Sequence, residues 1–396
     1  MPTPTLYTAQ QSVLFNQLPG ELQGNSVDLL YVTDRTPQRD RQGRLMYSAG
    51  RSTSLAFGSA MVSLGGESGW EKLMRDSQQR SRSGRPSVRL KSLTETGRFP
   101  ATPYPFTLYD GNYEPDRNSA AEFGRADAVL ADEISRRLEL TPRKELFLFI
   151  HGSDNTLEFA LETWAGMWHF LGREGVPVVY SWPAGPGGAP LTSYHYDRES
   201  GEFTVFHLKQ FIKSISSIEQ VERIHIVAHS RGTDVITTAI RELFIEARAS
   251  GVDMLQRYKF ANLLLIAPDL DMEVVGQRLA AERLAEGIGQ VTIYVSPTDR
   301  ALGLASVLFS SVLRFGQIQT EEIPEQVKVG DHMKNITFIE AGKSQGLGHG
   351  YFYDNPAVSS DIILLLRYAL PAGSRERPLI YIRRHFWKIP ADYLKP

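Results

Sequence analysis

The chain has 396 residues, of which 42% are hydrophobic and 22% are charged, a balance typical of a globular protein. Its net charge of −2 excludes the basic surface of a nucleic-acid-binding protein, and the absence of cysteine excludes disulfides, thiol catalysis and cysteine metal sites. The sequence has no apolar run of about 18 residues or more, so we expect no transmembrane segment.

The first residues, MPTPTLYTAQ, contain neither the basic segment nor the apolar segment of a signal peptide. A start rich in Pro and Thr also fits a chain whose export signal has been removed. We therefore expect either a periplasmic or secreted protein, including a lipoprotein, or a cytoplasmic one. The sequence does not separate these locations.

Residues 1–140 are polar and irregular, and we interpret them as an N-terminal extension that contributes the first strands and a helix. Apolar runs of strand length lie at 27–33 and 55–64, and a helical pattern covers 119–138. The basic, serine-rich segment 74–92 is predicted to be a solvated loop.

From residue 141 to 370, apolar runs of strand length alternate with helical patterns. Strands are expected at 145–150, 176–181, 223–228, 261–267, 291–295 and 336–340. Helices are expected at 156–171, 204–217, 233–249, 272–287, 301–314 and 357–369. Runs that are apolar on both faces and separated by helices predict a mainly parallel α/β sheet of about eight strands, covered on both sides. Residues 371–396 are expected to pack on this core as a tail.

The segment IHIVAHSRG ends a strand-like run in His, Ser, Arg and Gly immediately before a helical pattern. Ser230 lies in the predicted strand-to-helix turn, and the residues two before and two after it, Ala228 and Gly232, are small. Larger side chains would collide in so tight a turn, which presents a nucleophilic serine in hydrolases. A serine that only caps the following helix is the alternative.

A serine hydroxyl becomes a nucleophile when a neighbouring imidazole takes its proton. His349, in the glycine-flanked segment GLGHGYFYDNP, is the predicted base, and Asp299, in TIYVSPTDRAL, is the predicted carboxylate that orients it. Asp269 and Asp271, in LIAPDLD after the preceding strand, are the alternatives for the acid, or they cap the next helix.

Two backbone N–H groups are needed to bind the oxyanion of the reaction intermediate. We expect them from Arg231, directly after the serine, and from Ser153 in the loop HGSDNT. The guanidinium of Arg231 needs an anion if it is buried. We expect it to pair with Asp154, and a carboxylate on the substrate is the alternative.

The remaining candidates concern substrate and partners. Trp182 and Tyr194, in the Gly/Pro-rich loop expected between 181 and 204, and His229 beside the serine are predicted to contact a small-molecule ester. The apolar segment 302–315 is a candidate lid or homodimer surface. No metal-ligand spacing and no phosphate-binding loop occurs, so we expect no cofactor and no metal.

Taken together, these segments resemble the α/β-hydrolase superfamily, in which Ser, Asp and His follow one another in this chain order. The motifs LYVTDR, LAFGSAMVSL, IHGSDNTLEFA, VVYSWPAG, IVAHSRGTDVI, LIAPDLD and SPTDRAL resemble a bacterial esterase/lipase-like branch long catalogued as a domain of unknown function. The similarity runs from about residue 27 to 370 and implies a serine hydrolase mechanism. Arg231 and the pair Ser153-Asp154 depart from the residues common in that family, so the resemblance does not imply a substrate.

We therefore expect a serine hydrolase that cleaves carboxylic esters through an acyl-enzyme intermediate. The alternative is a catalytically silent α/β-hydrolase scaffold that binds a small molecule or a protein partner. Covalent labelling by a fluorophosphonate, which requires an activated serine, separates the two.

Overall fold

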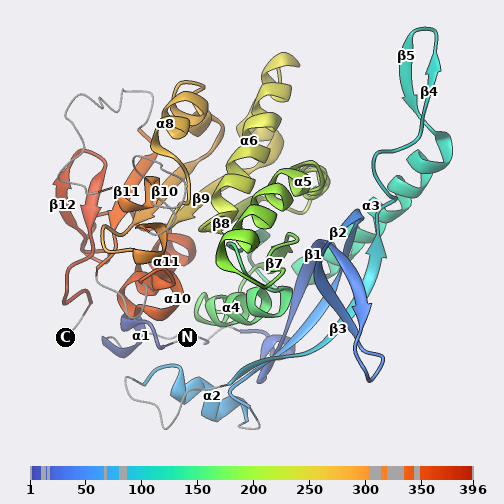
Figure 1. The fold of residues 1–396 in the computed structure, drawn as a ribbon. Helices are drawn as coiled ribbons and strands as arrows, with labels where there is room; N and C mark the ends of the chain where they lie inside the picture. The colour runs from blue at the N-terminus through green and yellow to red at the C-terminus, as the bar shows by residue number, and fades with distance from the viewer. Residues whose placement is uncertain are drawn as a thin grey trace.

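The computed structural model describes residues 2–9, 15, 18–66, 69–79, 87–303, 314–318, 334–342 and 348–394. Within these ranges one 11-stranded sheet dominates, with the strand order β12-β13-β11-β10-β9-β8-β6-β7-β1-β2-β3 (Figure 1). Its strands are β1 (Ser26–Arg39), β2 (Leu45–Leu64), β3 (Val88–Arg98), β6 (Glu145–Ile150), β7 (Val176–Ser181), β8 (Arg223–His229), β9 (Phe260–Ile266), β10 (Gln290–Val295), β11 (Ile336–Glu340), β12 (Ile380–Arg383) and β13 (Phe386–Lys388).

The sheet is mainly parallel, as predicted. Every neighbouring pair from β1 through β7, β6, β8, β9, β10 and β11 to β13 is parallel, and only β1–β2, β2–β3 and β12–β13 are antiparallel. The central strands β6 (ELFLFI) and β7 (VPVVYS) are buried along their whole length. Strands apolar on both faces require a layer of helices on each side.

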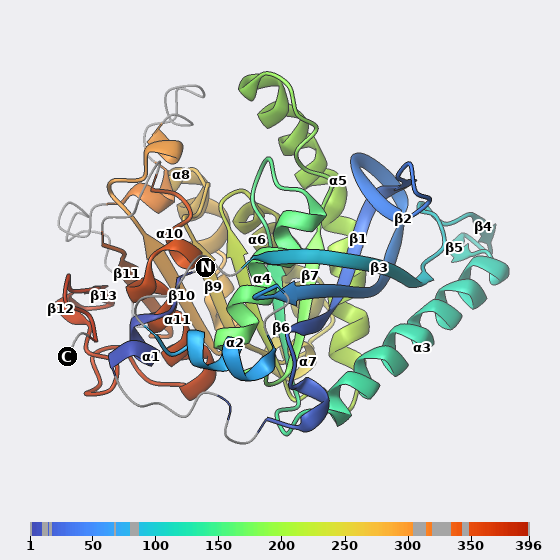
Figure 2. The ribbon, with the colours of Figure 1, turned by 90° about the horizontal axis from the view of Figure 1, so that it is seen from below.

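The two faces carry separate hydrophobic layers. One layer includes α3 (Arg117–Glu139), α5 (Pro190–Ser217), α6 (Gly232–Ala249) and α7 (Met254–Tyr258). The other includes α1 (Thr5–Ala9), α2 (Trp70–Asp76), α4 (Leu157–Phe170), α10 (Tyr351–Asp354) and α11 (Pro356–Tyr368), with α1 lying against α11 (Figure 2). Shorter helical turns are η1 (Gly20–Leu22), α8 (Met272–Val274), η2 (Val275–Ala280), η3 (Leu284–Gly287) and η4 (Phe315–Gln317).

The predicted strands at 27–33 and 55–64 belong to the same sheet as the core, because Leu30–Thr33 of β1 pair with Val178–Ser181 of β7. The sheet has more strands than the eight predicted. β3 occupies part of the segment predicted to be a loop at 74–92, and β12 and β13 lie in the C-terminal tail, where β13 pairs with β11.

The loop predicted between 181 and 204 is shorter than expected. Helix α5 begins at Pro190, and proline at a first helical position needs no N–H partner and has a helical φ. The helix predicted at 301–314 lies mostly outside the described residues.

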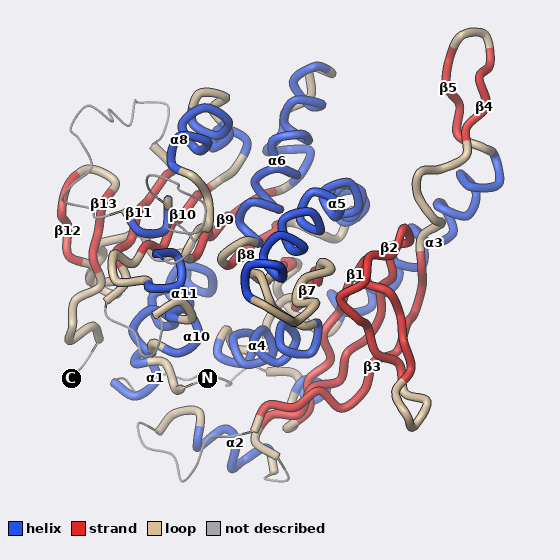
Figure 3. The backbone as a smooth tube through the Cα atoms, in the orientation of Figure 1, coloured by secondary structure: helices blue, strands red, loops and turns tan. Residues whose placement is uncertain are grey.

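A second, two-stranded sheet consists of β4 (Phe106–Tyr109) and β5 (Asn112–Pro115). It precedes α3 and stands apart from the main sheet, as the separate strand pair in Figure 3 shows. Among the residues that the structure describes, no helix has the length and hydropathy needed to span a membrane.

Candidate active site

Ser230 lies in the turn between β8 and α6, where the sequence predicts the nucleophile. Its φ of 53° is in the left-handed region, which residues other than glycine rarely adopt. The turn is fixed by two hydrogen bonds, from Ser230 N–H to the Ile266 carbonyl at 2.9 Å and from Thr233 N–H to the Ser230 carbonyl at 3.0 Å. A strained but fixed turn of this kind presents a serine at the carboxyl edge of the sheet.

Two glycines permit close packing around this turn. A Cβ on Gly232 would lie 2.4 Å from the carbonyl oxygen of His151, and a Cβ on Gly152 would lie 2.7 Å from the Cβ of Ser230. The start of α6 therefore packs directly against the end of β6. This contact explains the small residue two positions after the serine and brings the loop after β6 next to it.

His349 and Asp299 are hydrogen-bonded, with 2.7 Å between Nδ1 and Oδ2. Asp299 is buried in the turn after β10, and its other oxygen accepts from the N–H groups of Ala301 and Leu302, both at 3.1 Å. Because the carboxylate accepts, His349 donates from Nδ1, and in the neutral ring Nε2 then carries the lone pair. The structure thus brings together the two residues that the sequence paired.

The two alternative acids have other partners. Asp269 accepts a hydrogen bond from the Tyr194 hydroxyl at 2.6 Å and lies 3.4 Å from Nη1 of Arg314. Asp271 caps α8 by accepting from two backbone N–H groups of that helix. These contacts give both carboxylates structural roles.

The loop between β6 and α4 carries the second predicted oxyanion donor. Thr156 ends this loop and caps α4 by accepting from Phe159 N–H at 3.1 Å. Within the described part of the chain, the N–H groups of Ser153 and Arg231 make no hydrogen bond to a protein acceptor. Both donors are therefore available to a ligand.

Arg35, in the second half of β1, donates hydrogen bonds that fix the loop between β6 and α4. It donates from Nη2 to the Asn155 carbonyl at 2.6 Å, from Nη1 to the Ala184 carbonyl at 2.9 Å and from Nε to the Ser181 hydroxyl at 2.9 Å. Arg35 is buried, and burial lowers its pKa to about 10. Sequence analysis did not identify Arg35, although an apolar run that ends in polar residues, LLYVTDR, shows the same signal that identified Ser230.

His151 and Trp182 complete the support of the loop. His151 donates from Nδ1 to the Gly152 carbonyl at 2.8 Å, so its Nε2 accepts from the Ser181 hydroxyl at 2.9 Å. Burial, together with the charge of Arg35, lowers the pKa of His151 to about 3, so the ring is neutral. Trp182 stacks on this ring and donates from Nε1 to the His151 carbonyl at 2.8 Å. Trp182 is thus fully buried against His151, and its predicted contact with the substrate is not seen.

Arg231 forms an ion pair with Asp234 at 2.7 Å, one turn further along α6, and not with the predicted Asp154. Asp234 lies three residues after Arg231 on the same helix, so this pair needs little additional ordering of either side chain. Asp154 lies instead in the loop after β6, where its backbone N–H donates to Asp197 at 2.7 Å. Burial opposes the charge of Arg231, but Asp234 and other anionic neighbours outweigh it and raise the pKa of the guanidinium. The guanidinium also lies 6.0 Å from the centre of the Tyr194 ring.

Ser230 and His349 border one cavity of about 300 Å³. Its other lining residues are Phe149, Ser153, Asn155, Phe159, His229, Gly348, Gly350, Phe352, Tyr353 and Asp354. The structure therefore brings Ser230, His349, Ser153 and His229 to the same cavity. It does not bring Trp182 or Tyr194 there.

His229 anchors the loop that carries His349. Its Nε2 donates to the His349 carbonyl at 3.0 Å, and the two rings lie 4.7 Å apart. Burial, together with the neighbouring His349, lowers the pKa of His229 to about 3. His229 thus stays neutral and adds no second charge beside the predicted base.

A larger cavity of about 1260 Å³ lies between the β1–β2 hairpin, β3 and the start of α4. It contains none of the predicted catalytic residues, and two of its arginines form ion pairs within it, Arg44 with Asp40 and Arg98 with Glu95. The predicted nucleophile and base, Ser230 and His349, line the smaller cavity instead. Within the described ranges, no group of three or more His, Asp or Glu side chains is arranged to hold a metal ion.

Comparison with known proteins gives one match. The family model described as alpha/beta hydrolase of unknown function (DUF900) matches residues 126–367, which include Ser230, Asp299 and His349. No curated protein and no solved structure matches the chain at a significant level. The matched region covers more than half of the chain and spans the sheet from β6 to β11. The chain belongs to this family of alpha/beta hydrolases.

Proposed function

We propose that the protein is a serine hydrolase that cleaves carboxylic esters through an acyl-enzyme intermediate. The observation that carries the proposal is the 2.7 Å hydrogen bond between His349 and Asp299, with His349 on the same cavity as Ser230. A histidine held in the Nδ1–H tautomer presents Nε2 to take a proton from a hydroxyl.

In the proposed reaction, the Ser230 hydroxyl attacks the ester carbonyl carbon while Nε2 of His349 takes its proton. The oxyanion accepts hydrogen bonds from the N–H groups of Arg231 and Ser153. His349 then gives the proton to the departing alcohol oxygen, which leaves an acyl group on Ser230. Water attacks the acyl carbon with His349 again as base, and the acid leaves as Ser230 regains its proton. Asp299 stabilises the imidazolium in both halves of the reaction.

The size of the cavity supports a short acyl group. Its volume of about 300 Å³ is at the small end of the range for ligand cavities, and it is lined by Phe149, Phe159 and Phe352. We expect an esterase for short-chain esters, and not a lipase for long-chain ones. A series of p-nitrophenyl esters measures this directly, with kcat/KM expected to be highest for acetate or butyrate and at least tenfold lower for palmitate.

Fluorophosphonate labelling tests the proposal itself. The wild-type chain should be labelled covalently and the Ser230→Ala variant should not, with unchanged circular dichroism as the control for folding. The mass of a labelled peptide should identify Ser230. A folded wild-type protein that is not labelled would favour the non-catalytic scaffold.

A further inference from the structure

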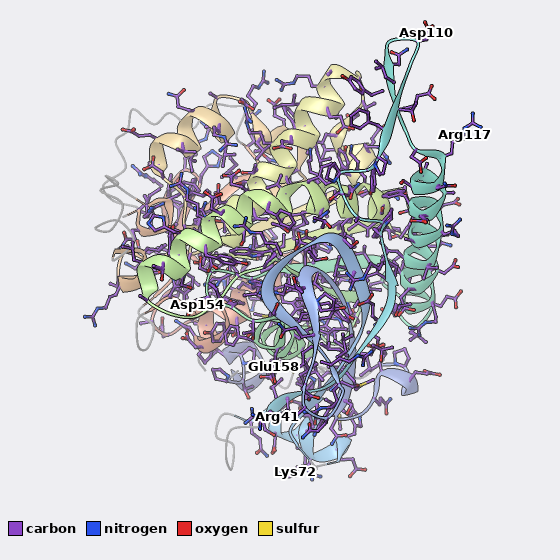
Figure 4. The ribbon with its side chains drawn as sticks, turned by 45° about the vertical axis from the view of Figure 1, so that its right-hand side comes forward. Arg41, Lys72, Asp110, Arg117, Asp154 and Glu158 are labelled. Carbon is purple, nitrogen blue, oxygen red and sulfur yellow. The ribbon has the colours of Figure 1, made fainter. Side chains whose placement is uncertain are left out.

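The sheet of β4 and β5 forms an arm whose shape is encoded locally. Its strands are joined by Asp110 and Gly111, with φ values of 47° and 77°, and a two-residue turn with both φ values positive joins antiparallel strands tightly. The arm projects beyond the body of the protein, with Asp110 at its tip and Arg117, the first residue of α3, at its base (Figure 4).

One face of the arm is apolar and uncovered. Phe106, Leu108 and Tyr113 lie on one face, because Leu108 is paired with Tyr113 and residues two apart on a strand share a face. Phe106 and Leu108 are each 62% exposed and Tyr113 is 73% exposed. An isolated two-stranded hairpin is marginally stable in water, so this face gains stability from a partner.

A cavity beside the base of the arm provides a complementary surface. It lies between the end of β3 and α3 and has a volume of about 490 Å³. Its lining residues include the apolar Phe99, Pro100, Ala126 and Val129 and the charged Arg98, Glu122 and Arg125. Val129 is 39% exposed there, although it belongs to a helix that packs on the core.

The acidic arm has one complementary charge in the cavity. Residues 101–116, which form the arm and its base, contain three acidic residues and neither Lys nor Arg. The cavity contributes the exposed cation Arg125, beside the exposed anion Glu122, so Arg125 is the charge that complements the acidic arm. We propose that the arm of one copy docks in this cavity of a second copy, and that the second copy does the same in return, so that the two arms lie antiparallel across a two-fold axis.

The area of such an exchange is sufficient for a stable dimer. Aromatic side chains bury about 150–250 Å² each when covered, so covering the three exposed apolar side chains removes roughly 400 Å² per arm from water. An equal area is covered on the partner and the contact occurs twice, which gives about 1,600 Å², the size of a standard stable interface.

Sedimentation equilibrium of the full chain tests the proposal. The wild-type protein should have twice the chain mass of 44.4 kDa at micromolar concentration. The triple variant Phe106→Ser, Leu108→Ser, Tyr113→Ser should be monomeric at the same concentration. A control variant with Thr107→Ala and Asn112→Ser, on the opposite face of the arm, should remain dimeric. A wild-type protein that is monomeric would overturn the proposal, and this includes a monomer that instead binds phosphatidylcholine vesicles through the arm. A dimer that survives the triple substitution would overturn it as well.

Disulfide trapping tests the geometry, because the natural chain contains no cysteine. One sample carries Asp110→Cys at the arm tip and a second carries Glu122→Cys in the cavity. After mixing and mild oxidation, a disulfide-linked heterodimer should form. Asp110→Cys mixed with Glu246→Cys, which lies on the exposed surface of α6, should give less than a tenth of that product. Equal yields from the two mixtures would contradict an arm seated in the cavity.

Discussion

Arg35 offers the sharpest test of how the N-terminal strands support the site. In Arg35→Lys the charge stays, but an ammonium on a flexible stem cannot reproduce the planar guanidinium that reaches Asn155, Ala184 and Ser181 together. At least two charge-assisted hydrogen bonds are lost. At about 1.5–3 kcal/mol each, loss of two such bonds should lower the unfolding free energy of the variant by roughly 3–6 kcal/mol.

The same substitution should lower kcat by about 10- to 100-fold with little change in KM. Arg35 holds the Asn155 carbonyl two residues beyond Ser153, and a displaced oxyanion donor loses interaction with the transition state more than with the bound ester. Complete loss of such a donor typically lowers kcat by about 10²–10³, which sets the upper limit. The assay is p-nitrophenyl butyrate hydrolysis at a temperature where circular dichroism shows the variant to be folded.

Arg173 provides the matched control. It is buried and donates to the carbonyls of Leu22 and Gly24, both at 2.8 Å, but it lies just before β7 begins, at the opposite edge of the sheet from Ser230. Arg173→Lys should lower stability to a similar degree and leave kcat of the folded enzyme unchanged. If both variants have the same kcat, Arg35 has only a structural role and the reasoning is refuted.

Three further predictions follow from the site. Asp299→Asn should lower kcat by about 10³–10⁴, whereas Asp269→Asn should mainly lower the melting temperature. If Asp269→Asn instead shows the large loss of kcat in the same ester assay, the acid is Asp269. Gly232→Ala should destabilise the fold by about 1–3 kcal/mol in urea unfolding, because the new Cβ meets the backbone oxygen of His151 at 2.4 Å, and an unchanged midpoint would argue against that contact. In the folded protein His151 has a pKa of about 3 and is neutral, whereas in the unfolded chain it has its ordinary pKa of 6.5. Between pH 6.5 and 3 only the unfolded chain therefore binds a proton at this residue. The unfolding free energy should fall as the pH drops through this range, by up to about 1.4 kcal/mol per pH unit. His151→Asn should show a shallower pH slope, and equal slopes would contradict a buried neutral ring.

Local chemistry explains why much of the site could be predicted from the sequence. Gly232 is required by the close approach of the His151 carbonyl, and Gly348 has a φ of 73°, so both appear in the sequence as a pattern around Ser230 and His349. The hydrogen bond between His349 and Asp299 follows from the rule that loops at the carboxyl ends of parallel strands meet at one edge of the sheet.

The parts that could not be predicted depend on contacts between distant segments. Trp182 has the same type of sequence context as a substrate-binding aromatic residue, and only the folded structure shows that it is fully buried and stacked on His151. The partner of Arg231 is an exception, because Asp234 lies three residues further along the predicted helix and such a pair can be expected from the sequence spacing alone. The arm could have been found, because Asp110-Gly111 between residues with strand propensity is a strong local signal of a hairpin.

The pairing of β1 with β7 and of β13 with β11 has a consequence for working with shortened chains. The segment that matches the family model, residues 126–367, lacks both β1 and β13. A fragment cut to those limits would leave unpaired backbone N–H and C=O groups along β7 and β11. Bare edges of a sheet recruit other strands, and such a fragment should aggregate. It would also lack Arg35, so any soluble portion should have an unsupported loop beside Ser230. The boundary of the recognisable family segment is thus not the boundary of the smallest unit that can fold and function.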